Sequence, residues 1–158
     1  MTNFNTMFSG FRLLLMLPIF ALPVLAVADD GLAVVTSQYG VAETEERLVE
    51  AVEGKGLTIM AQVDHQANAK TVDMDMPATR LLLFGNPQAG TQLMACAPTV
   101  AIDLPMKMLI WQDGETVKVA YNTADYLVER HGIGDCAASV QATMKKALDG
   151  LAHAVAGD

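Results

Sequence analysis

The sequence has few basic side chains and few aromatic ones. Among 158 residues, Lys and Arg number 10 against 18 Asp and Glu, and aromatic residues make up 6% of the chain. Proteins that bind a nucleic-acid backbone rely on many Lys and Arg contacts, and those that bind single strands stack the bases on aromatic rings. The formal charge of −8 and the single Trp therefore argue against a nucleic-acid partner.

Common catalytic motifs are also missing. The chain has no Gly-x-Ser-x-Gly nucleophile turn, no phosphate-cradling glycine loop and no His-Glu-x-x-His zinc motif. It has only two cysteines, Cys96 and Cys136, and they do not form a Cys-x-x-Cys pair, so nothing supports a thioredoxin-like redox role. These absences favour a binding or interaction module over an enzyme.

Residues 1–28 are typical of an export signal. One base, Arg12, precedes an uncharged stretch that ends in Ala-Val-Ala at 26–28. As a helix this stretch would span about 24 Å, less than the hydrocarbon core of about 30 Å, which makes an uncleaved anchor the weaker alternative. We therefore expect a signal peptide at 1–28, a periplasmic or secreted domain at 29–158, and no stable membrane anchor after cleavage. The mature domain would keep nine bases against 18 acids, a charge of −9.

The two cysteines have two possible states. Both belong to the expected mature domain, so export would bring them into an oxidising compartment where a Cys96–Cys136 disulfide can form. Such a bridge would close a loop of about 40 residues and stabilise the fold by about 4 kcal/mol in the chain-entropy model. Two small buried thiols are the alternative, because the sequence gives no distance between them.

Hydrophobic periodicity predicts one α+β domain. A period of two from 57 to 65 places His65 with the apolar side of a strand. The dipeptide Asp113-Gly114 predicts a hairpin with a type I′ turn. The other expected elements are a strand at 32–38, helices at 41–54, 66–72 (capped by Asp64) and 91–97, a buried strand in 80–87, and helices at 123–131 and from 135 onward. We expect the order strand-helix-four strands-helix, with an antiparallel sheet covered on one face by helices.

Four segments in this order carry a resemblance to a known family: DHQANAK at 64–70, LLLFGNPQAGTQLM at 81–94, DLPMKMLIW at 103–111 and YNTADYLVERHG at 121–132. Together they resemble the domain of unknown function 302 family. The resemblance implies an α+β fold similar to the TATA-box-binding-protein-like class, often as a homodimer, and it implies no activity. It does not imply DNA binding, because the domain is acidic and function resides in sites rather than folds.

A few polar side chains at the edges of these segments are candidates for binding a small ligand. We expect a groove near His65 and His131, and the full set of candidate ligand-binding residues is His65, Asn86, Asp103, Lys107, Asn122 and His131. Structural roles are the alternatives: a helix cap for His131, a core histidine for His65, and a surface pair for Lys107 with Asp103.

Methionines suggest a metal hypothesis. Met74 and Met76 form a Met-x-Met after His65, and thioethers with an imidazole suit Cu(I); haem iron is a second possible cofactor. The alternative is that methionines such as Met60, Met106, Met108 and Met144 fill gaps in a core that is short of Phe.

Three functions follow as hypotheses. The first is an exported small-ligand or metal-binding module. The second is a structural or interaction homodimer without a ligand. The third is a thiol-dependent enzyme, which would need a free cysteine.

Overall fold

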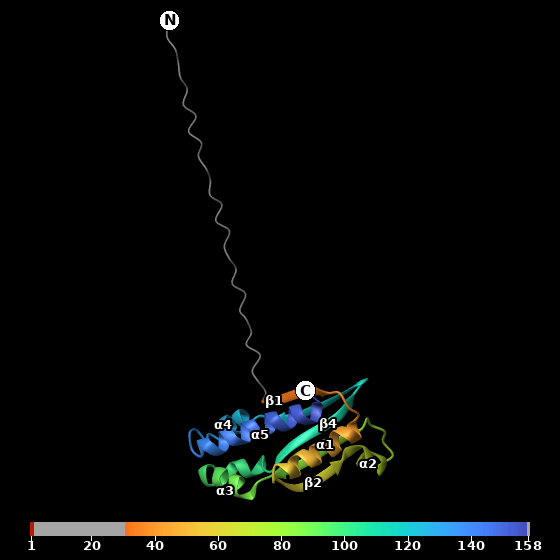
Figure 1. Cartoon of the computed structure of the whole chain (residues 1–158), viewed down its shortest axis with the longest axis horizontal. Helices are drawn as coiled ribbons and strands as arrows, with labels where there is room; N and C mark the ends of the chain where they lie inside the picture. The colour runs from red at the N-terminus through yellow and green to blue at the C-terminus, as the bar shows by residue number, and fades with distance from the viewer. Residues whose placement is uncertain (2–30, 158) are drawn as a thin grey trace.

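A computed structural model of the chain describes Met1 and residues 31–157 (Figure 1). The predicted signal peptide at 1–28 lies outside the described residues, apart from Met1. In the part that the structure describes, no helix combines the length and the apolar character needed to cross a membrane.

Five antiparallel strands form one sheet, which confirms the predicted α+β class. The order across the sheet is β1-β5-β4-β3-β2, so β1 and β2 are its edge strands. The strands are β1 (Leu32–Ser37), β2 (Thr58–Asp64), β3 (Thr79–Gly85), β4 (Met106–Asp113) and β5 (Thr116–Asn122).

Two long helices cover one face of this sheet. Figure 1 shows α1 (Val41–Gly54) and α5 (Ala138–Ala156) lying across the strands, and the two helices contact each other. Each presents an apolar stripe, with Leu48 and Val52 on α1 and Leu148 and Leu151 on α5, all essentially buried. The strands meet them with alternate residues, as the pleat requires: Leu82, Phe84, Met106, Met108, Ile110, Val117, Val119 and Tyr121. The hydrophobic core therefore lies between the helices and this covered face.

The opposite, open face carries the other alternate residues. These are Leu32, Val34 and Thr36 of β1, Lys118, Ala120 and Asn122 of β5, Lys107, Leu109 and Trp111 of β4, Leu81 and Leu83 of β3, and Ala61 and Val63 of β2. In the described residues no helix packs over them, and Leu32 and Val34 are 46% and 49% exposed.

Shorter helices sit at the two ends of the sheet, and side-chain caps fix where they begin. They are α2 (His65–Lys70), α3 (Pro87–Cys96), the 3₁₀ helix η1 (Pro98–Ile102) and α4 (Ala124–Arg130). The Asp64, Asn86 and Thr123 side chains each accept a hydrogen bond from the backbone N–H three residues later. The predicted Asp64 cap is thus present, although α2 begins at His65 rather than at 66.

A β-bulge changes the predicted faces of β2. The register shifts between Ile59 and Ala61, so Ile59 lies opposite Phe84 on the covered face while Ala61 lies opposite Leu83 on the open face. The strand then ends at Asp64, and His65 starts a helix. The prediction that every second residue from Leu57 to His65 lies on one apolar face is therefore wrong, because the extra residue in the bulge reverses the alternation.

The β4–β5 hairpin occurs as predicted, with a different turn. Asp113 pairs with Thr116, so the two-residue loop is Gly114-Glu115. Only Gly114 has a positive φ, +58°, which fits the first central position of a type II′ turn. The predicted type I′ turn at Asp113-Gly114 is wrong by one residue, since the strand continues through Asp113.

A hydrogen bond connects α5 to strand β5 of the sheet. The Tyr121 hydroxyl donates to Asp149 Oδ1 at 2.8 Å. Burial of the ring, together with this bond to the carboxylate, raises the pKa of Tyr121 to about 12. The phenol therefore stays protonated and keeps donating across the physiological range.

Candidate functional site

Polar side chains from four elements meet at one end of the sheet. We call this group the polar corner; hydrogen bonds and ion pairs connect Thr99, Asp103, Lys107, Arg130 and His131, and Asn122 stands at the same end of the sheet, at the end of β5. Because β4 and β5 are antiparallel, the start of β4 and the end of β5 lie at the same end, where η1 enters β4 and α4 follows β5. If the β4–β5 register is continued for two residues beyond the Leu109–Ala120 pair, Lys107 lies opposite Asn122. Both residues belong to the open face.

His131 joins two segments that are far apart in the sequence. Its Nε2 lies 2.7 Å from Asp103 Oδ2 and its Nδ1 lies 3.1 Å from Thr99 Oγ1. A carboxylate only accepts hydrogen bonds, so the Nε2 atom carries a proton. The His131 side chain is 6% exposed, and both ring nitrogens are occupied. It therefore acts as a positioned link between α4 and η1 and not as an open general base.

Two cations contact Asp103, one at its carboxylate and one at its backbone oxygen. Arg130 Nε lies 3.4 Å from Asp103 Oδ2, and its Nη1 donates to the Tyr126 hydroxyl at 2.6 Å. This hydrogen bond, followed by the nearby Asp103 charge, raises the pKa of Arg130. Lys107 Nζ donates at 2.8 Å to the backbone oxygen of Asp103 rather than to its carboxylate. The corner therefore holds two fixed positive charges against one negative charge.

The start of β1 packs closely beside the corner. Gly31 has φ +75°, and a Cβ atom there would come within 2.3 Å of the Tyr126 side chain. Its carbonyl accepts a hydrogen bond from the Thr123 backbone N–H at 2.7 Å, and the next residue, Leu32, pairs with Asn122. Glycine at 31 is required both by the left-handed backbone and by the lack of space.

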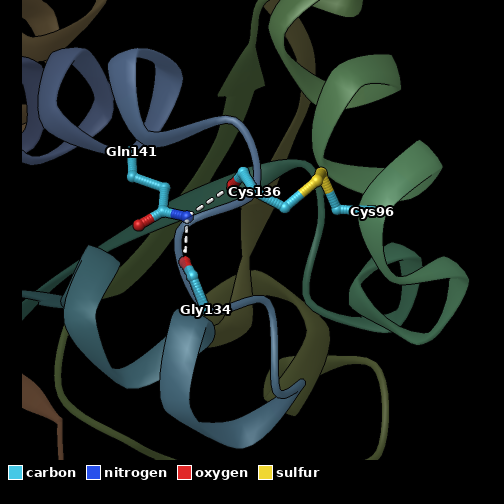
Figure 2. Close-up of a disulfide and its surroundings, with 4 residues drawn as sticks. All are labelled: Cys96, Gly134, Cys136 and Gln141. Carbon is cyan, nitrogen blue, oxygen red and sulfur yellow. Dashed lines mark hydrogen bonds between the residues drawn. A yellow bond between two sulfur atoms is a disulfide. The ribbon is translucent and has the colours of Figure 1, made fainter.

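A disulfide joins the segments next to those that His131 links. Cys96, at the end of α3, and Cys136, in the loop before α5, are bonded, with their Cα atoms 5.9 Å apart (Figure 2). Figure 2 also shows Gln141, whose Nε2 donates to the carbonyls of Gly134 and Cys136 and so fixes that loop. Of the two states that the sequence allowed, the bridge is the one observed. The hypothesis of a thiol-dependent enzyme loses its nucleophile, because neither cysteine is free.

The structure separates the other two candidate residues from the corner. Asn86 stands at the same end of the sheet but caps α3, where its Oδ1 accepts from the Ala89 backbone N–H at 3.1 Å. His65 follows β2 at the opposite end, level with the start of β3 at Arg80. β3 spans about 20 Å from Arg80 to Asn86, and Figure 1 places α2 and α3 at opposite ends of the molecule. A single groove containing both His65 and His131 is therefore wrong.

The residues of the metal hypothesis lie in α2 and the loop that follows it, at that far end. Met74 and Met76 belong to the loop between α2 and β3, and Gln66 Nε2, next to His65, donates to the Met76 carbonyl at 3.3 Å. Met74 is exposed. In the described part of the chain, no three His, Cys, Asp or Glu side chains gather to hold a metal ion. Copper ligation by His65, Met74 and Met76, and haem binding, stay predictions.

Sequence reasoning missed two members of the site. Thr99 contacts His131 and lies in none of the four segments quoted above, and Tyr126 contacts Arg130 and lies in YNTADYLVERHG but was not among the candidates. Tyr126 lies four residues before Arg130 on a predicted helix, a spacing that places side chains on one face and would have indicated the contact. No local signal identifies Thr99, whose partner is 32 residues away.

Two kinds of known protein are similar to this chain. The chain is 40% identical over 113 residues to fluoride-specific ion channel FluC 1 of Brucella suis biovar 1 (strain 1330), covering 71% of this chain and 44% of that protein. The identity and the coverage of this chain are the same for FluC 1 of Brucella abortus biovar 1 (strain 9-941) and FluC 2 of Brucella melitensis biotype 1, with 42% of each relative covered. The chain thus spans less than half the length of these curated relatives.

A crystal structure shares the fold. The uncharacterized conserved protein DUF302 from Bacillus stearothermophilus superposes with a TM-score of 0.71 at 21% sequence identity, over 80% of this chain and 98% of that one. The model of the family described as "Domain of unknown function DUF302" matches residues 33–151. This range contains all of the polar corner and all five strands, apart from the first residue of β1. The chain belongs to this family, as the resemblance of its four segments implied.

Proposed function

We propose that this domain is an exported binding module that holds a small anion at the polar corner. The observation that carries the proposal is the charge balance there. The Asp103 carboxylate is already shared by His131 and Arg130, whereas Lys107 uses one of its three N–H donors on a backbone oxygen. A surplus positive charge with unused donors, in a chain of net charge −8, favours an anionic ligand.

Fluoride is the first anion to test. The relatives from Brucella are named as fluoride-specific channels, and this chain matches a part of them. Fluoride is a compact anion that accepts hydrogen bonds from N–H groups. Lys107, Arg130 and the Asn122 amide all carry such donors. Small carboxylates would use the same donors, and they serve as the comparison.

We expect fluoride to bind the purified domain and Lys107→Met to abolish most of that binding. Removing the ammonium leaves the corner with no net positive charge, and a charge-assisted hydrogen bond contributes about 1.5–3 kcal/mol, which corresponds to roughly a 10- to 150-fold loss of affinity. Titration followed by ¹⁹F NMR of the fluoride ion measures this directly, and acetate and chloride are then tested as competitors.

Lys118→Met is the matched control. Lys118 lies on the same open face, but its ammonium donates to Thr36 Oγ1 at 2.7 Å, away from Asp103. The control should bind fluoride like the unmodified domain. Equal losses in the two variants, or no retention of fluoride, acetate or chloride, would show that the corner is not an anion site.

The disulfide supports the exported location. Bridges of this kind persist in oxidising compartments and are rare where thiols are kept reduced. Together with the leader-like residues 1–28, the bond between Cys96 and Cys136 favours a periplasmic or secreted domain. Fractionation of cells that produce the full chain, followed by mass determination of the mature N-terminus, tests this location.

A homodimer is the second candidate, favoured by the open face of the sheet. Leu32 and Val34 are half exposed there, beside partly buried Leu109 and Trp111, and the face carries no Glu and no Asp other than Asp113 at its rim. Two copies meeting through it would bury apolar side chains without opposing carboxylates. We therefore infer a second copy of this chain as the occupant of that face.

We expect Val34→Glu to shift the domain from dimer to monomer, because each copy would bury an unpaired carboxylate in the interface. Sedimentation velocity over a dilution series measures the equilibrium. Ile102→Glu provides the matched control, since Ile102 is 74% exposed and lies on η1, away from the sheet. A monomer at every concentration before substitution would refute the dimer.

A further inference from the structure

A hollow lies on the helix-covered side of the molecule. This groove, of about 770 Å³, runs between α3 and α5 over the start of β2, the end of β3 and the start of β4. Its floor is the outer surface of the core, including Phe84, Leu93 and Leu148, and its lining is mainly apolar. Its volume is in the range of about 300–1,000 Å³ that is typical of small-molecule sites. No residue of the polar corner lines it.

Methionines are concentrated in this groove. Met60, Met94, Met106 and Met144 all line it. The expectation that such methionines fill the core holds for Met106, which is buried, but Met60 is half exposed and Met144 only half buried. Unbranched thioether side chains adapt their shape to a partner, and they are over-used at surfaces that accept varied apolar ligands. The groove is therefore suited to a flexible alkyl chain.

Unpaired cations stand at its mouth. Lys55, at the end of α1, lines the groove, and Lys146 lines the shallow hollow that adjoins it at Lys55, Thr143 and Ala147. Within residues 31–157, neither ammonium has a carboxylate within salt-bridge distance. In a chain with 18 acids and 10 bases, two lysines without an ion pair beside an apolar groove provide charge complementarity for an anionic head group, and Asp149, which lines the same shallow hollow, is occupied by the Tyr121 hydroxyl.

We propose that this groove binds a long-chain carboxylate, with the alkyl chain on the methionine-lined floor and the carboxylate at Lys55 and Lys146. The ligand is a free fatty acid. An alkyl alcohol would gain the apolar contacts alone, and an alkyl ammonium would be repelled by the two lysines. The site is separate from the polar corner, so the two proposals stand or fall independently.

Isothermal titration with dodecanoate, dodecanol and dodecyltrimethylammonium, each below its micelle concentration, tests the head-group preference. We expect dodecanoate to bind most tightly and the ammonium most weakly. Lys55→Glu with Lys146→Glu should weaken dodecanoate binding at least about tenfold while changing dodecanol binding less than about twofold. Lys70→Glu, an exposed substitution on α2, is the matched charge control and should leave both affinities unchanged.

Blocking the groove tests the position of the alkyl chain. Thr143 is exposed on α5 at the groove mouth, so Thr143→Trp fills the entrance without disturbing the core. This variant should lose both dodecanoate and dodecanol, whereas Thr116→Trp at the β-hairpin should lose neither. Thermal melting verifies that all variants are folded. Tighter binding of the ammonium than of the carboxylate, or unchanged binding by Thr143→Trp, would overturn the proposal.

Discussion

Breaking the Cys96–Cys136 disulfide is expected to lower the free energy of unfolding by about 4 kcal/mol. The bond joins residues 40 apart, and in the chain-entropy model a loop of this length restricts the unfolded chain by that amount. This loss is a large fraction of the total stability of a folded domain, which is typically about 5–15 kcal/mol. Urea denaturation of the oxidised protein and of the Cys96→Ala, Cys136→Ala double variant measures the difference.

Adding a reductant to the double variant serves as the control. Reduction should move the urea midpoint of the unmodified domain and leave that of the variant unchanged. Because the bond lies three residues before Thr99 and five residues after His131, reduction should also loosen the His131 contacts and weaken fluoride binding at the polar corner. Identical midpoints for the oxidised and reduced domain would contradict the expected contribution.

Leu48→Ala is expected to destabilise the domain by about 3 kcal/mol, within the range of about 2–5 kcal/mol that such truncations cost. Leu48 has no exposed surface and lies at the centre of the α1 stripe, against the covered face of the sheet. Alanine is the better helix former, so the loss reflects packing and the cavity left behind, and not helix propensity. Chemical denaturation gives the value.

Ile102→Ala is the matched truncation. Ile102 is another large aliphatic residue, but it is exposed on η1, so its loss should cost less than about 0.5 kcal/mol. The contrast between these two positions tests whether the core lies under α1 and α5. A cost at Ile102 equal to that at Leu48 would place the core elsewhere.

Local patterns were sufficient to predict most of the fold. The spacing of Val41, Leu48 and Val52 predicts α1, and Gly114 between two apolar runs predicts the β4–β5 hairpin, because each signal depends on residues close in sequence. The bulge in β2 depends on how that strand meets β3, and no pattern within β2 reveals it. The dipeptide Asn86-Pro87, an N-cap followed by proline, marks the start of α3, whereas the predicted strand in 80–87 runs too far and the predicted helix at 91–97 begins too late.

The candidate site was predictable to a smaller extent. Asp103 and Lys107 lie four residues apart, and their proximity follows from the sequence alone. The contacts of His131 with Asp103 and Thr99 join residues about 30 apart, and they exist because two antiparallel strands bring η1 and α4 to the same end of the sheet. Conversely, His65 and His131 are chemically alike, and only the topology shows that they lie far apart.

The bulge in β2 also limits how copies of this domain can associate. β1 and β2 are the edge strands of the sheet, and within residues 31–157 each has one row of backbone N–H and C=O groups that no neighbouring strand satisfies. An incoming strand needs a regular repeat of such groups, and the irregularity between Ile59 and Ala61 interrupts that repeat on the β2 border. Continuous strand-by-strand growth into a ribbon is thereby blocked on this side, which protects a domain with an apolar sheet from aggregation.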